Sequence, residues 1–234
     1  DCFDVFPYIA DKSVNLILCD LPYGTTACKW DSILPFDKLW KEYERIITDN
    51  GAIVLTASQP FTSALVMSNP KMFKYEWIWY KNKGGNPLNA KIQPMKQHEN
   101  ILVFGKGKTI YNPILEERTE SGKQRVLSAR VKGGNIKKDA VYGQTNIIFT
   151  NYSEMRLPQT VQYINVERGL HPTQKPLELM KYLIKTYSNE DDVVMDNCMG
   201  SNTTGLACKE LNRQYIGIEK DKNYYDISVS RVLS

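Results

Sequence analysis

The chain has 234 residues, of which 42% are hydrophobic and 24% charged, and a formal net charge of +4, values ordinary for a globular protein that buries a core. Its apolar runs are far shorter than the roughly 18 residues that cross a bilayer, so no membrane span is expected. Five cysteines without a CxxC pair, and only two histidines, argue against a disulfide framework or a metal centre and favour a reducing, cytoplasmic setting.

Residues 14–19 are apolar nearly throughout and predict a buried strand, which ends abruptly at the sequence Asp20-Leu21-Pro22-Tyr23-Gly24. A plain strand-ending turn is one interpretation. The other is a site for a ring amine, whose lone pair is delocalised into the ring. Asp20 and the carbonyl of Leu21 or Pro22 would accept its two N–H bonds and turn the lone pair towards an electrophile. Tyr23 would stack on a base flipped out of its helix.

The next stretch, 36–51, has apolar residues at helical spacing and closes with Asn50-Gly51, which predicts a helix that ends there. A strand followed by a helix and a strand favours a parallel α/β sheet. Trp77, Trp79 and Tyr80 are interpreted as core residues. His98 and Glu99 are interpreted as structural residues that cap a strand, with a catalytic role as the alternative. Three further apolar runs predict strands at 51–58, 75–81 and 99–106.

Between Lys81 and His171 the chain has glycine pairs, scattered prolines and few periodic runs, which predict an inserted lobe or long loops. Residues 106–138 contain nine basic and three acidic residues, a net +6, while the rest of the chain is −2. Such a concentration is typical of a polyanion-binding segment, although a solvated loop explains the charge equally well. The basic residues are Lys106, Lys108, Arg118, Lys123, Arg125, Arg130, Lys132, Lys137 and Lys138.

The last part of the chain begins with a predicted helix that starts at Pro176, where the missing N–H has no cost. It continues as a predicted strand, loop, helix and second strand, which together make one βαβ unit. These four elements are expected at residues 193–195, 196–202, 203–211 and 215–219.

The loop of this βαβ unit has one glycine, Gly200, where a dinucleotide-binding loop has three. Asp196 would repel a pyrophosphate but would tolerate or hold a cationic cofactor. Glu219, which ends the second strand, is placed to accept hydrogen bonds from two ribose hydroxyls. The pattern therefore favours S-adenosylmethionine over NAD or FAD, with an ordinary βαβ turn as the alternative.

Taken in this order, the motifs resemble those of the permuted, β-group amino-group DNA methyltransferases. "DLPYG" resembles their Asp-Pro-Pro-Tyr catalytic motif, with Leu21 in place of the first proline. "DNCMGSNTT" resembles their Asp-x-Phe-x-Gly-Ser-Gly-Thr-Thr cofactor loop, with Cys198 in place of the phenylalanine and Asn202 in place of the last glycine. "HPTQKP" is similar to the segment before that loop, and "DCFDVFPYIADKSVNLIL", "WIWYKNKGGNP" and "QHENILVFGK" also match. The similarity covers 1–105 and 171–226.

The resemblance implies a Rossmann-like α/β methyltransferase fold that depends on S-adenosylmethionine and has a mostly parallel sheet. The catalytic and cofactor core is expected at 1–81 and 171–234, and a target-recognition insert plus the middle strands at 82–170. The nine basic residues would contact DNA. The implied catalytic residues are Asp20, Pro22 and Tyr23. The implied cofactor-binding residues are Asp1, Cys2, Asp20, His171, Thr173, Lys175, Asp196, Cys198, Gly200, Ser201, Asn202, Thr203, Thr204 and Glu219.

Family members with an acid at the position of Asp20 mostly methylate adenine. The resemblance therefore implies methyl transfer to N6 of a flipped adenine in double-stranded DNA. The alternatives are the cytosine N4 amine, an RNA or protein glutamine substrate, and a catalytically inactive nucleic-acid binder. Cytosine carbon methylation is disfavoured because the chain has no Pro-Cys pair. A homodimer and a paired restriction enzyme stay open as partners.

Overall fold

The computed structural model describes residues 1–26, 28, 31–85, 87–131, 154–167 and 174–233. The chain divides into two compact units, one of Asp1–Asn112 with Thr160–Ser234 and one of Pro113–Gln159. Within the described residues, the larger unit holds a seven-stranded sheet and the smaller unit a two-stranded one. None of the helices in these residues has both the length and the apolarity needed to cross a membrane.

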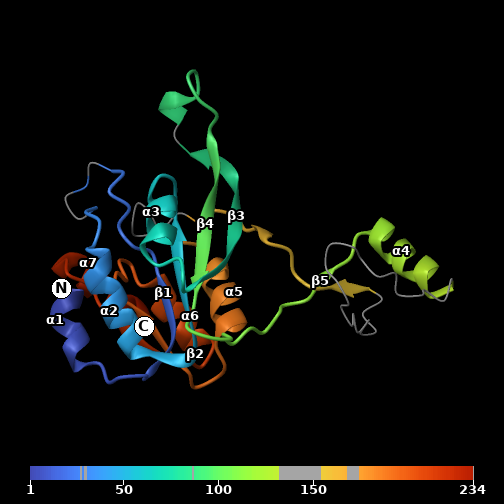
Figure 1. The fold of residues 1–234 in the computed structure, drawn as a ribbon. Helices are drawn as coiled ribbons and strands as arrows, with labels where there is room; N and C mark the ends of the chain where they lie inside the picture. Colours follow the sequence, from blue (N-terminus) through green and yellow to red (C-terminus); the bar gives the residue numbers. More distant parts are fainter. Residues whose placement is uncertain (27, 29–30, 86, 132–153, 168–173, 234) are drawn as a thin grey trace. The chain divides into compact units, whose positions relative to one another are not determined.

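The seven-stranded sheet has the order β7-β3-β4-β2-β1-β8-β9 (Figure 1). β1 pairs in parallel with β2 and β8, β8 with β9, and β3 with β7, whereas β4 runs antiparallel between β2 and β3. The sheet is therefore mostly parallel, as predicted. The strands are β1 Val14–Cys19, β2 Ile47–Ala57, β3 Phe73–Gly85, β4 Lys96–Phe104, β7 Val161–Tyr163, β8 Val193–Asp196 and β9 Gln214–Gly217.

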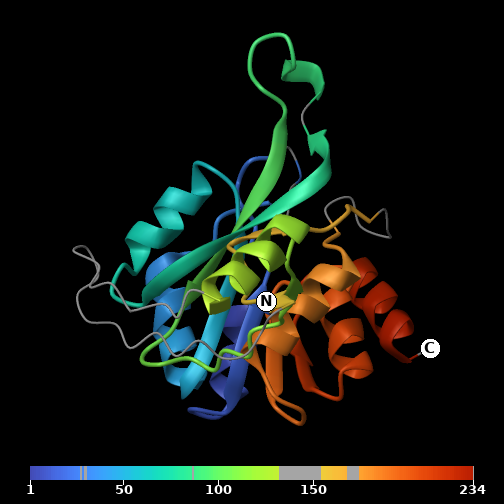
Figure 2. The same ribbon diagram turned by 90° about the vertical axis from the view of Figure 1, so that its right-hand side faces the viewer.

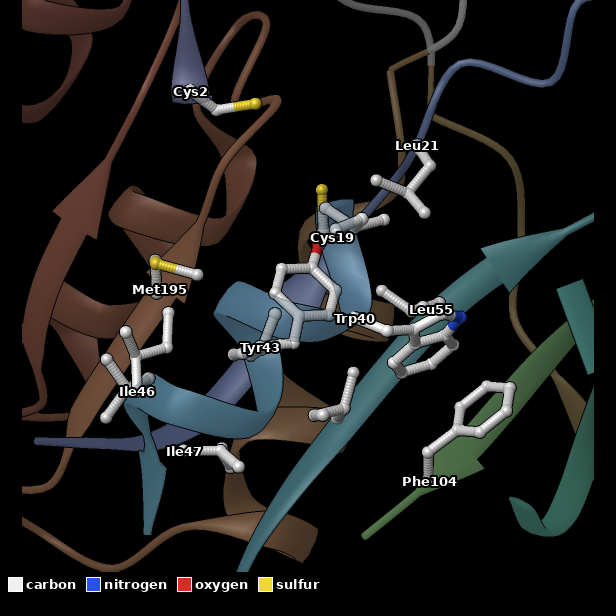
Figure 3. Close-up of a cluster of buried hydrophobic side chains, with 14 of the residues drawn as sticks. Cys2, Cys19, Leu21, Trp40, Tyr43, Ile46, Ile47, Leu55, Phe104 and Met195 are labelled. Carbon is white, nitrogen blue, oxygen red and sulfur yellow. The ribbon is translucent and has the colours of Figure 1, made fainter. Parts of the chain in front are cut away.

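Helices cover both faces of this sheet, because successive strand residues point to opposite sides. On one face Ile17 and Leu55 pack with α1, α2 and α3, and Figure 3 shows Trp40, Tyr43 and other side chains of α2 in this layer. On the other face α5 and α6 pack against residues that include Leu18 and Val54. The helices are α1 Cys2–Val5, α2 Phe36–Ile46, α3 Phe61–Ser68, α5 Leu177–Tyr187, α6 Thr203–Glu210 and α7 Lys222–Leu233, with 3-10 turns at Phe6–Tyr8 and Pro87–Asn89.

The helix expected to run to Asn50-Gly51 ends at Ile46, so this boundary was predicted wrongly. β2 begins at the next residue, Ile47, which pairs with Val14 of β1. The branched side chains of Ile47 and Thr48 favour extended backbone, and pairing with β1 adds to that preference. The helical spacing of Ile47 therefore misled the sequence pattern.

β3 and β4 form a long antiparallel hairpin, and Figures 1 and 2 show the end that carries its turn standing clear of the other strands. Trp77 and Trp79 are buried in the core, as predicted, but Tyr80 is 36% exposed, so its assignment to the core was wrong. Because β4 runs against its neighbours, its first residues lie where β1 and β8 end. The pairing of Trp79 with Glu99 places both residues at that edge.

The βαβ unit predicted at the end of the chain is present as β8, α6 and β9, with β8 and β9 paired in parallel. Its observed boundaries differ from the expected ones by one or two residues. The helix expected from Pro176 is α5, which Pro176 precedes at the N-cap position.

The smaller unit consists of a short antiparallel pair, β5 Glu116–Glu117 with β6 Met155–Arg156, and helix α4 Glu120–Val131. An ion pair of 3.0 Å joins the Arg156 guanidinium to the Glu116 carboxylate across the two strands. The segment 82–170 is thus shared between the units, because β4 and β7 belong to the main sheet.

Candidate active site

The parallel strands of the larger unit end at one edge of the sheet, which is where open α/β sheets bind ligands. A cavity of about 1140 Å³ lies at this edge. Residues that the sequence singles out line much of it. They are Asp1, Cys2, Asp20, Pro22, Tyr23, Lys175, Asp196, Cys198, Gly200, Ser201, Thr203, Thr204 and Glu219.

Asp20 follows the last residue of β1, and its carboxylate is held from two sides. The Tyr23 hydroxyl lies 2.8 Å from Oδ1, and the Thr56 hydroxyl of β2 donates to the same oxygen. On the other side, the ammonium of Lys175 lies 2.5 Å from Oδ2. Asp20 is therefore fixed in orientation, yet a quarter of its side chain (25%) stays exposed.

The Tyr23 ring stacks on Phe61 of α3, with ring centroids 5.1 Å apart and an angle of 26° between the planes. Burial, together with the charges of Asp20 and Glu99, raises the pKa of the Tyr23 phenol well above its usual value. The phenol is therefore neutral and available as a hydrogen-bond donor beside Asp20.

Lys175 precedes α5 and has only 8% of its side chain exposed, an unusual degree of burial for a lysine. Besides Asp20, it lies 3.5 Å from Oε2 of Glu99. Burial alone would lower the pKa of Lys175, but the two carboxylates outweigh it and raise that pKa. Burial alone would likewise raise the pKa of Glu99, but Lys175 and Lys81 lower it. Lys175 and Glu99 are therefore both charged at neutral pH.

Thr56, Lys81 and Glu99 belong to the site, although the sequence analysis did not assign them to it. Glu99 lines the cavity, whereas its neighbour His98 does not, so interpreting both as strand-end residues missed a difference between them. The available signals were the Thr56 hydroxyl within the apolar run 51–58 and charges at the ends of two apolar strands.

Asp196, the last residue of β8, is 4% exposed. Its Oδ2 accepts a hydrogen bond from the Thr204 hydroxyl at 2.7 Å, and its Oδ1 one from the Cys198 amide at 3.1 Å. Burial raises the pKa of Asp196 to about 6, and these two hydrogen bonds limit the rise. Near neutral pH the site thus offers a buried carboxylate that a cation would stabilise.

The loop after β8 is tied to the end of β9 by Glu219. One oxygen of Glu219 accepts the Gly200 amide at 2.9 Å and the other accepts the Asp221 amide at 2.8 Å. Gly200 has φ +50°, a left-handed conformation that favours glycine. Each oxygen of Glu219 keeps capacity for a further donor from the cavity.

Asn202 has φ +62° and caps α6 by accepting the Gly205 amide at 3.0 Å. It does not line the cavity. His171 and Thr173, which were also expected at the cofactor, lie outside the described residues.

Asp1 and Cys2 also line the cavity, at the start of α1, where Asp1 is the N-cap. The Asp1 carboxylate caps that helix through the Phe3 amide and lies 3.3 Å from the Lys220 ammonium. Burial raises the pKa of the Cys2 thiol to about 11, so it is a neutral, unreactive group. Among the described residues, no cluster of His, Cys, Asp or Glu is able to hold a metal ion.

The nine basic residues predicted to contact DNA do not lie together in one compact unit of the chain. Lys106 and Lys108 follow the end of β4, at the sheet edge opposite the cavity, where Lys106 donates to the Ile47 carbonyl at 3.4 Å. Arg118, Lys123 and Arg125 belong to the smaller unit. The side chain of Arg130, and Lys132, Lys137 and Lys138, lie outside the described part of the chain.

Comparison with known proteins gives concordant findings. The family model N6_N4_Mtase, described as DNA methylase, matches residues 14–230. The Type II methyltransferase M.HinfI of Haemophilus influenzae is 44% identical, covering 99% of this chain and 66% of that protein. The DNA adenine methyltransferase YhdJ of Escherichia coli (strain K12) is 27% identical, covering 96% and 78%. A crystal structure of an M1.HpyAVI-SAM complex matches with a TM-score of 0.64 and 26% identity, covering 99% and 96%.

Proposed function

The chain belongs to the N6_N4_Mtase family of DNA methylases, and from this premise we propose that it transfers a methyl group from S-adenosylmethionine to N6 of adenine in DNA. The observation that carries the proposal is that Asp20 lines the same cavity as Asp196, Gly200 and Glu219 of the βαβ unit. The chain is also similar to an adenine methyltransferase and to a protein solved with S-adenosylmethionine.

The cavity residues fit this cofactor. S-adenosylmethionine supplies a methyl group on a positively charged sulfur, which is already a strong electrophile. Asp196 is a buried acid whose charge is costly without a positive partner, so an ammonium or sulfonium nearby would stabilise it. Glu219 would accept hydrogen bonds from ribose hydroxyls, as acids at this position of a βαβ unit do. Asp1, Cys2, Cys198, Gly200, Ser201, Thr203 and Thr204, which line the cavity, complete the proposed cofactor site. His171 and Thr173 stay predictions there, whereas Asn202 acts on the site only as the cap of α6.

Catalysis by the chain's own residues would be mostly orientation and placement of charge. Oδ2 of Asp20 would accept one N–H of the target amine, and the carbonyl of Leu21 or Pro22 the other. The lone pair of the amine would then face the methyl group. Tyr23 and Pro22 would contact the ring, with Tyr23 itself held in place by Phe61. A proline here limits the loop's freedom to move away.

DNA would be the partner of this site, and a flipped base its substrate. We propose that the smaller unit, residues 113–159, takes part in recognition of the target, with its basic residues on phosphates. A homodimer, a paired restriction enzyme and a cytoplasmic location stay predictions.

The test is methyl transfer from labelled S-adenosylmethionine to unmethylated genomic DNA, with the product digested to nucleosides for mass spectrometry. N6-methyladenine is the expected product. N4-methylcytosine as the product would support the proposed amine methylation but show that the target base is cytosine, not adenine. Binding of the cofactor without any label in DNA would overturn DNA as the substrate and direct the assay to RNA and protein.

A further inference from the structure

The ion pair between Asp20 and Lys175 leads to an inference that rests on the proposed function. We propose that Lys175 donates a hydrogen bond to the ring nitrogen beside the target amine, which is N1 in adenine. Asp20 and Lys175 would then read the edge of the flipped base together, as acceptor and donor. Lys175 would be a base-binding residue rather than only a counter-ion.

The hydrogen-bonding capacity of the pair supports this. A lysine ammonium has three donors. Within the described residues, one is directed to Asp20 at 2.5 Å and a second to Glu99 at 3.5 Å, which leaves a third. Oδ2 of Asp20 accepts Lys175 and retains a lone pair, since an ionised carboxylate has about four acceptor sites. One donor and one acceptor thus remain side by side.

The chemistry of adenine matches that arrangement. Its amine donor N6 and its ring acceptor N1 are both bonded to the same carbon, so they too lie side by side on the Watson–Crick edge. Enzymes that flip a base read that edge by hydrogen bonds. Cytosine has the same arrangement at N4 and N3, so the pair would read either base amine in the same way.

The surroundings keep Lys175 in place and charged. Glu99 and Lys175 line the same cavity as Asp20, and Lys81 pairs with the other oxygen of Glu99. Among the described residues, Oε2 of Glu99 has no partner with good hydrogen-bond geometry. Glu99 therefore attracts Lys175 mainly through its charge. A lone buried lysine would tend to lose its proton, and the two acids prevent that.

This hydrogen bond would serve binding and orientation more than activation. A cation beside N1 withdraws electrons from the ring and makes N6 a weaker nucleophile, an effect that the adjacent Asp20 carboxylate offsets. Loss of the contact should therefore raise KM for DNA more than it lowers kcat. If Lys175 has only a structural role, replacing it should not change how strongly the activity depends on N1 of the base.

The experiment uses a duplex with the recognition sequence, which is read from the methylated genomic DNA, and a second duplex with 1-deazaadenine as the target. The analogue keeps the amine and replaces N1 by C–H. Lys175→Met alone would leave two buried acids under-compensated and would destabilise the fold. It is therefore combined with Glu99→Gln, and the single variant Glu99→Gln is the matched control. Stabilisation by S-adenosylmethionine in thermal unfolding shows that each variant is folded.

The wild type and Glu99→Gln should lose about 10-fold to 100-fold in kcat/KM on the analogue, mostly through KM. The double variant should be slow on both duplexes and lose no further activity on the analogue. A similar loss in all three proteins, or no loss in the wild type, would overturn the role of Lys175. Failure of the wild type to methylate the normal duplex would instead overturn the proposed function, and this inference with it.

Discussion

The Asp20 side chain is held firmly at the cavity, because three polar groups converge on its two oxygens. Such convergence fixes the direction of the remaining lone pairs. An acid that must orient an amine needs such a fixed direction. Its surroundings therefore fit a positioning role in methyl transfer.

Replacing Asp20 by Asn should lower the rate of methyl transfer by about 100-fold or more, because an amide cannot match the charge and acceptor capacity of the carboxylate. The affinity for S-adenosylmethionine should stay nearly unchanged. Single-turnover transfer and cofactor titration measure the two effects separately.

Asp49→Asn is the matched control, since it removes an exposed carboxylate that pairs with Lys12 at the other end of β2. It should leave the transfer rate unaltered. Full activity in Asp20→Asn, or equal losses in both variants, would show that Asp20 does not orient the amine.

Cofactor binding should weaken as the pH falls, because of Asp196. Its folded-state pKa is raised to about 6 by burial, so its carboxyl becomes protonated below that pH and no longer attracts a cation. The affinity for S-adenosylmethionine should then fall by up to about tenfold per pH unit between pH 6 and 5 and level off above pH 7. Calorimetric titration at several pH values measures the midpoint.

Thr204→Val provides the control for that assignment. It removes the 2.7 Å hydrogen bond to Asp196, so the pKa of Asp196 should rise and the midpoint of the binding curve should move to higher pH. Asp196→Asn should bind weakly without this pH dependence. A midpoint that stays in place in both variants would assign the titration to another group.

Some of these residues are visible in the sequence because they end apolar strands. Asp20 directly follows β1 and Asp196 ends β8, and the carboxyl ends of parallel strands meet at one edge. Thr56 and Glu99 could not be placed in this way. Their position depends on strand register and on the antiparallel direction of β4, which the sequence pattern does not contain.

At the scale of elements, the start of α6 depends on one residue. Asn202 adopts a left-handed backbone and also caps the helix by accepting the Gly205 amide. The related motif has glycine here, which is free of the steric cost but has no capping side chain. Asparagine adopts the left-handed backbone more readily than most residues and also supplies a capping side chain.

Asn202→Ala should therefore lower the free energy of unfolding by about 2 kcal/mol, since it loses the cap and adds the strain of a left-handed alanine. Asn202→Gly should cost only a few tenths of a kcal/mol. Urea denaturation of the two variants measures the difference. Equal stability of the glycine and alanine variants would mean that the backbone at this position relaxes.

The elements themselves were largely predictable, but their ends and directions were less so. The apolar runs at 75–81 and 99–106 identify β3 and β4, yet a fully apolar run gives no strand direction. The end of α2 was misplaced because Ile47 satisfies both the helical spacing and the strand pairing. Only the tertiary contact with Val14 decides between them.

At the scale of the molecule, the main sheet is built from two distant stretches of the chain, 1–112 and 160–234, and the second unit lies between them in sequence. Composition alone indicated such an insertion, because charge and glycine increase where periodicity is lost. The range 82–170 was expected to hold both the insert and the middle strands, and which of its residues serve recognition stays a prediction. The basic residues are accordingly distributed over both units.

Binding to DNA should weaken steeply with salt if the smaller unit contacts phosphates. Each phosphate contact contributes about 0.9 to the slope of log affinity against log salt concentration. Replacing Arg118, Lys123 and Arg125 by Gln should therefore reduce that slope by up to about 3 and weaken binding to all sequences alike. Fluorescence anisotropy with a labelled duplex at several salt concentrations measures the slope.

The double variant Lys106→Gln and Lys108→Gln tests the same loss of charge at the sheet edge opposite the cavity. A base held beside Asp20 is at the other edge, so this variant should change the slope much less than the triple variant. The reverse result would mean that the duplex runs past the amino ends of the parallel strands. In that case the basic residues of the smaller unit would serve its own structure, as the 2.8 Å pair between Lys123 and Glu120 already does.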